Sequence, residues 1–188
     1  MNTPKVGRIT AVALGLALAT SMAAAQVLDS NAQTIALNAT LAESFTVSLS
    51  ASAVNFTLAA GTAANPGSTN ITATTTWVLG PGRTSVGVNA YFANATAALT
   101  DGAGHNIPSS AFFIANNAGA STPLTNTVAF GAANGGLQLT NVAITGANQS
   151  ASQSDVMAFN INLTGGTLPQ LPAATYTGTL NIQAQATP

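Results

Sequence analysis

The sequence predicts an all-β protein, a single antiparallel β-sandwich of about eight to ten short strands that follows a cleaved helical signal peptide. Apolar residues recur at every second position in most segments, which is the period of a half-buried strand. Glycine and proline recur too often between these segments for long helices. Alanine is abundant, but it alternates with threonine, asparagine and glycine, so the period decides the class rather than the alanine content.

Residues 1–25 have the layout of a secretory signal peptide. Lys5 and Arg8 precede an apolar stretch, residues 9–19, and an Ala-x-Ala tail ends at Ala25. The alternative is a membrane anchor, but a bilayer-spanning helix needs roughly 20 unbroken apolar residues, and this stretch is soon diluted by threonine and serine. We therefore expect cleavage after the tail, no membrane insertion afterwards, and a secreted protein that reaches the extracellular space or the outer cell surface through the periplasm.

The remaining chain divides into a flexible start, residues 26–33, and one predicted β-sandwich domain, residues 34–188. About 160 mature residues suit one domain. The sequence contains no cysteine, and a chain of this length can bury a core without disulfides. We therefore expect stability that does not depend on the redox state.

The first alternating segment spans residues 34–41. Alternation resumes after a break of phase near Glu43, and a turn-rich loop of residues 59–69 ends this part of the chain. The apolar positions are Ile35, Leu37, Ala39 and Leu41, then Phe45, Val47 and Leu49, then Val54, Phe56 and Leu58.

A hairpin is predicted around Gly80-Pro81-Gly82, because alternating segments flank this tight-turn triplet. The segment before the turn places Ile71, Ala73, Thr75, Trp77 and Leu79 on one face, and the segment after it alternates at Val86, Val88, Ala90 and Phe92.

The C-terminal half contains the clearest strand pattern. Brief strands are expected at residues 112–114, 125–130 and 137–144, and strict alternation follows at residues 157–163. In the last strand, the apolar face consists of Tyr176, Gly178, Leu180, Ile182, Ala184 and Ala186, and threonine, asparagine and glutamine occupy the other face. This hydrophobic-in, polar-out pattern is typical of an antiparallel sandwich.

The shortage of charged residues excludes most chemistry. Beyond the leader the chain has one basic residue, Arg83, one histidine, His105, and four scattered acids, which are Asp29, Glu43, Asp101 and Asp155. Serine-type catalysis needs a base beside the nucleophile, and glycoside hydrolysis needs two carboxylates that flank the bond. The sequence therefore predicts no enzyme, no catalytic residue, no metal cluster and no cofactor. Weak calcium binding through backbone carbonyls near Asp101 or Asp155 stays open.

The same shortage bears on partners. Without a basic patch we expect no nucleic-acid binding. Low charge gives little repulsion between copies, which favours self-association, although a secreted monomer is the alternative. The position of Trp77 on an alternating strand predicts a core residue, and the alternative is a sugar-stacking platform.

Residues 171–182, Leu-Pro-Ala-Ala-Thr-Tyr-Thr-Gly-Thr-Leu-Asn-Ile, resemble the closing strand of bacterial surface subunits, notably spore coat U-like and chaperone–usher pilin domains. The residues that carry this closing-strand motif are Pro172, Tyr176, Gly178, Leu180 and Ile182. The chain departs from these families at Ala174, where the pattern favours glycine, and in lacking the paired cysteines of many pilins.

The resemblance implies an immunoglobulin-like sandwich that lacks one strand and is completed by the N-terminal extension of the next subunit. Residues 34–41 would then be the donor strand, with Ile35, Leu37, Ala39 and Leu41 filling the groove of a neighbour. The alternative is that the same residues form the first strand of their own sheet, because any half-buried strand alternates.

Two functions therefore stay open. The first is a non-catalytic secreted structural or adhesive subunit that assembles by strand addition with copies of itself or related surface subunits, with a periplasmic chaperone and usher as further partners. The second is a monomeric secreted binding module, with a polysaccharide as the expected ligand.

Overall fold

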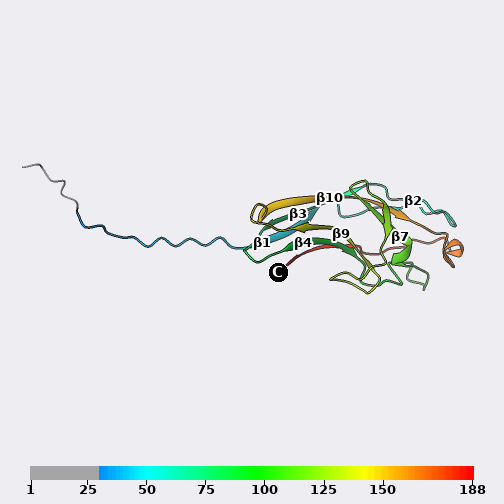
Figure 1. Ribbon diagram of the computed structural model, residues 1–188. Coiled ribbons are helices and arrows are strands. Elements are labelled where there is room, and N and C mark those ends of the chain that lie inside the picture. Colours follow the sequence, from blue (N-terminus) through cyan, green and yellow to red (C-terminus); the bar gives the residue numbers. More distant parts are fainter. Residues whose placement is uncertain (1–29) are drawn as a thin grey trace, which may run out of the picture. The chain divides into compact units, whose positions relative to one another are not determined.

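Two antiparallel β-sheets, stacked as a sandwich, form the framework of the protein (Figure 1). The computed structural model describes residues 30–188, so the predicted signal peptide lies outside the described residues. The chain divides into two units, Met1–Ala39 and Thr40–Pro188, and both sheets belong to the second. The all-β antiparallel sandwich predicted from the sequence is confirmed.

The larger sheet has the strand order β1-β3-β10-β7-β8, and β2 also pairs with β10. The smaller sheet has the order β11-β4-β9, and β5 and β6 pair separately. The strands of the larger sheet are β1 (Ser44–Leu49), β2 (Asn65–Pro66), β3 (Ile71–Val78), β7 (Phe112–Asn116), β8 (Ser121–Pro123) and β10 (Ser150–Ile161). The others are β4 (Ser85–Tyr91), β9 (Gly136–Ala143), β11 (Asn181–Thr187), β5 (Leu99–Thr100) and β6 (Asn106–Ile107), and two single-turn 3-10 helices span Ser109–Ala111 and Leu168–Gln170.

The core lies between the two sheets and follows the predicted alternation. On β3 every second residue from Ile71 to Trp77 is buried, and on β10 the same holds from Asp155 to Ile161. These inner faces pack against residues of β4 and β9, such as Ala90 and Leu137, in one large apolar cluster. Burial of this surface is the main favourable contribution to folding.

The hairpin predicted around Gly80-Pro81-Gly82 is wrong. β3 pairs with β1 and β10, whereas β4 pairs with β11 and β9, so the turn carries the chain from one sheet to the other. Both flanking segments bury an apolar face, and these faces meet across the sandwich: Trp77 and Val86 share a second, smaller core cluster. Alternation reports which face is buried, but it does not report which strand is the neighbour.

The N-terminal segment forms no strand before Ser44, although residues 34–41 alternate. The expectation that these residues form the first strand of their own sheet is therefore not met. At the other end of the chain, the last strand begins only at Asn181, and the preceding predicted part makes a single bridge, between Thr177 and Thr100. Within residues 30–188 there is no helix of the length and hydrophobicity needed to span a membrane.

The turn between β7 and β8 contains two non-glycine residues with left-handed backbone angles. Asn117 has φ 50° and Ala118 has φ 58°, and the amide of Gly119 donates to the carbonyl of Asn116 at 2.8 Å. This is a type I′ turn, whose second central position favours glycine because alanine costs about 1–2 kcal/mol in this region.

We predict that Ala118→Gly raises the free energy of unfolding by about 0.5–1 kcal/mol, because relief of the backbone strain exceeds the added chain entropy of glycine. Urea unfolding followed by circular dichroism measures this difference. Ala120→Gly, directly after the turn and without a positive φ, is the matched control and should be neutral or destabilising. An Ala118→Gly variant no more stable than the parent would contradict the prediction.

Candidate binding groove

The strands β1 and β11 are edges of their sheets, because each has one ladder partner, β3 and β4 respectively. The two edges approach each other on the same side of the sandwich. Each leaves a row of backbone amides and carbonyls without a ladder partner among the described strands. An open groove of about 730 Å³ lies along this side, between the segment that follows β1 and the segment that precedes β11.

Most of the residues that line the groove are apolar, five are serine, asparagine or threonine, and none carries a charge. One wall comes from Leu49, Val54, Phe56 and Leu58, the other from Tyr176, Leu180 and Ile182, and the floor from Ile71, Phe112, Met157 and Phe159. The floor is buried, whereas the walls are only partly buried and Leu49 is 46% exposed. The groove is thus an opening into the main core, with a volume in the range of about 300–1,000 Å³ found for ligand pockets.

The first wall is held by the loop that precedes β3. Phe56 forms a bridge with Gly67, and the amide of Ser68 donates to the carbonyl of Asn55 at 2.8 Å. A Cβ at Gly67 would meet Val54 at 2.6 Å, so glycine permits this close approach. The sequence predicted an ordinary strand here, but the wall has this single bridge only.

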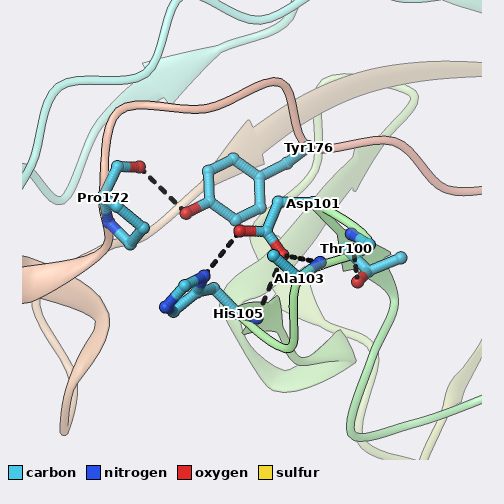
Figure 2. Close-up of polar contacts among 7 residues, drawn as sticks. Thr100, Asp101, Ala103, His105, Pro172 and Tyr176 are labelled. Atoms are coloured by element: carbon cyan, nitrogen blue, oxygen red, sulfur yellow. Dashed lines mark hydrogen bonds and ion pairs between the residues drawn. The ribbon is translucent and has the colours of Figure 1, made fainter.

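The second wall contains the closing-strand motif, and four of its five residues line this groove, whereas Pro172 lies just before the wall. The Tyr176 hydroxyl donates to the carbonyl of Pro172 at 3.0 Å, which closes the loop before the wall (Figure 2). Thr177 and Thr100 exchange two backbone hydrogen bonds of 2.9 Å. Gly178 packs against the carbonyl of Ala98, which a Cβ at position 178 would overlap. Leu180 and Ile182 then present their side chains to the groove.

A hydrogen-bonded pair of Asp101 and His105 lies in the turn next to this wall. Asp101 Oδ2 lies 2.6 Å from His105 Nδ1, and Asp101 Oδ1 accepts from the amides of Ala103 and His105 (Figure 2). Partial burial alone would raise the pKa of Asp101, but the hydrogen bonds from His105 and the two amides outweigh it and lower this pKa. Burial, and then the nearby Asp101 charge, raise the pKa of Tyr176. His105, the single histidine of the sequence, therefore stabilises the turn of residues 101–105.

The other charged pair lies where the chain enters the sandwich. Glu43 accepts from the Gly80 amide at 2.6 Å and from Arg83 Nη2 at 3.1 Å. The hydrogen bonds from Arg83 and then Gly80 lower the pKa of Glu43. They bind the start of β1 to the turn that joins the two sheets.

Trp77 is buried in the core and is not placed to stack against a ligand. Its side chain is 2% exposed, and the indole Nε1 donates to the carbonyl of Asn148 at 2.8 Å. A buried indole with a satisfied N–H is a core residue and offers no ring face to a sugar.

The predicted donor residues are exposed. The exposed fractions are 85% for Ile35, 91% for Leu37 and 85% for Leu41, and Ala39 is exposed as well. Large apolar side chains are seldom this exposed in succession on one strand face. The apolar side chains of residues 34–41 are therefore not packed against any other described residues.

No group of three or more histidine, cysteine, aspartate or glutamate side chains within residues 30–188 is placed to share a metal ion. No protein-family model, curated protein or solved structure matches this chain.

Sequence analysis did not identify Leu49, Val54 and Phe56 as residues that line a groove. The available signal was the weak strand pattern between residues 50 and 58.

We predict that Gly178→Ala lowers the free energy of unfolding by about 2 kcal/mol, because the new methyl group forces the second wall away from the Ala98 carbonyl. Chemical denaturation of the purified variant measures the loss. Gly146→Ala is the matched control, because an added Cβ there meets nothing within 4 Å. Equal losses in the two variants would show that the close approach at Gly178 is not a packing constraint.

Proposed function

We propose that this protein is a secreted, non-catalytic structural subunit whose copies assemble by strand addition, with residues 34–41 of one copy bound in the groove of the next. The observation that carries the proposal is the pairing of two features in one chain. One is an exposed segment with apolar residues at every second position, and the other is a mainly apolar, uncharged groove between the segment after β1 and the segment before β11.

The chemistry of the two features is complementary. An extended segment presents one face to the groove, which here is the face of Ile35, Leu37, Ala39 and Leu41. Its backbone would pair with the free edge of β1 or β11, and its apolar side chains would cover the partly exposed walls. The residues between them, such as Asn38, would face solvent.

The attachment point favours a groove in a second copy. The segment joins the sandwich at Ser44, which begins β1, whereas the groove wall begins at Leu49, which ends β1. The Glu43 contacts with Gly80 and Arg83 hold the chain at this far end. Insertion into another molecule meets no such restriction, and repetition of a head-to-tail contact builds a filament.

The carbohydrate-binding alternative has less support. It rested on an accessible Trp77, and this side chain is buried. Secretion through the periplasm, and a chaperone that covers the groove before assembly, follow from the proposal as further hypotheses.

We predict that Leu37→Asp abolishes assembly of the mature chain, residues 26–188. A charge placed in the apolar groove should weaken the contact by roughly a hundredfold or more, equivalent to about 3 kcal/mol. Because Leu37 is 91% exposed, the variant should fold normally. Size-exclusion chromatography with light scattering and negative-stain microscopy measure the assembly.

Asn38→Asp is the matched control, since it adds the same charge on the opposite face of the segment and should still assemble. A chain that lacks residues 26–41 should be a monomer whose Tm rises when a synthetic peptide of residues 34–41 is added. A parent protein that is a compact monomer, unaffected by the deletion, would refute strand addition.

A further inference from the structure

The last strand of the chain has a free backbone edge. In an antiparallel ladder, the N–H and C=O groups of successive residues point alternately to the two sides of a strand. The Ile144 amide donates to the Thr84 carbonyl at 2.8 Å, so the even-numbered residues of β4 pair with β9. The odd-numbered residues of β4 therefore pair with the odd-numbered residues of β11. The even-numbered residues of β11 point their backbone groups away from β4, and these are Ile182, Ala184 and Ala186.

The second wall of the groove continues this edge. Thr177 exchanges two backbone hydrogen bonds with Thr100, so the backbone groups of its neighbours point to the opposite side. No backbone hydrogen bond to Tyr176, Gly178 or Leu180 occurs within residues 30–188. These three residues also line the groove, together with Ile182. We define the closing edge as the even-numbered residues from 176 to 186, and its phase is unbroken.

The first wall offers a shorter and broken edge. The Ser68 amide donates to the Asn55 carbonyl, so Asn55 points toward the loop before β3. On β1, the Ser50 amide donates to the Thr72 carbonyl at 2.9 Å, so the odd-numbered residues, which include Leu49, point away from β3. A regular strand cannot stay in phase with both parts. The free positions of the wall itself are even-numbered, and they are Val54, Phe56 and Leu58.

The shape of the groove sets the direction of an added strand. At the far end of the two edges, Phe45 of β1 and Ala186 of β11 pack against the same small core cluster, and the groove opens where β1 ends and β11 begins. Residues 34–41, which we call the arm, join their own sandwich at Ser44. In a second copy the C-terminal end of the arm therefore stays at the mouth of the groove, and the arm runs antiparallel to residues 176–182.

We propose that the arm of one copy adds to the smaller sheet alone, antiparallel to the closing edge of the next copy, and contacts the first wall through side chains only. This inference rests on the proposed function and decides which of the two edges carries the backbone pairing. The closing edge offers four free positions in one phase along the groove, which matches the four apolar positions of the arm. The first wall offers three, and it runs parallel to the arm, which is the slightly less stable ladder.

This pairing assigns a direction to each backbone amide of the arm. In an antiparallel ladder, two residues that exchange hydrogen bonds carry their side chains on the same face. The amides of the four groove-facing residues therefore point to the closing edge, and the amides of the residues between them point to the first wall without bonding there. The groove-facing residues are Ile35, Leu37, Ala39 and Leu41, and the residues between them are Ala36, Asn38 and Thr40.

The test uses backbone N-methylation, which removes one N–H group and leaves the side chain unchanged. The acceptor is the mature Leu37→Asp chain, whose own arm should not assemble. Fluorescently labelled peptides of residues 34–41 carry one methyl group each. Methylation at Leu37 or Ala39 should raise the Kd at least about tenfold, because a hydrogen bond to the closing edge is lost. Methylation at Ala36 or Asn38 is the matched control and should leave the Kd nearly unchanged. Fluorescence anisotropy measures each Kd.

The opposite pattern, with losses at Ala36 and Asn38 alone, would overturn the proposal, because it would indicate pairing with the first wall or a parallel arm. Equal losses at all four positions would overturn it as well, since they would indicate pairing with both walls. The absence of any loss would show that side chains alone hold the arm. In these three cases strand addition itself stands. An unmodified peptide that does not bind would refute strand addition, and the assignment of the edge with it.

Discussion

The opening of the main core between the segment after β1 and the segment before β11 is the constraint on which the rest of the structure depends. Both strands are edges with one ladder partner each, and the groove opens where β1 ends and β11 begins. Free sheet edges above apolar surface invite a further strand. The Phe56–Gly67 bridge fixes the first wall, and the Thr177–Thr100 bridge and the Tyr176 hydrogen bond fix the second.

The few charges of the sandwich have distinct positions around this opening. Glu43 and Arg83 hold the chain where it enters β1, and Asp101 and His105 hold the turn behind the second wall. Asp155 alone is buried between the sheets. A surface covered mainly by hydroxyl and amide groups offers little repulsion to another copy, which agrees with the proposed assembly through backbone pairing and apolar contacts.

Several elements were predictable because they depend on local pattern. The inner faces of β3 and β10 follow the alternation at Ile71, Trp77 and Met157. Residues 34–41, as a possible donor strand, and the closing-strand motif were also singled out from the sequence. The prediction of a hairpin around Pro81 was wrong, because alternation indicates the buried face of a strand but does not indicate which strand pairs with it.

By itself, the sequence determined the all-β class, the core faces and the scarcity of charge, because these follow from composition and a two-residue period. Only the tertiary structure decided that Leu49 and Leu180 line the same groove, and that Asp155 is buried with one carboxylate oxygen unpaired among the described residues. Both depend on contacts between residues far apart in the sequence, and no local pattern encodes which distant strands meet or which edge stays open.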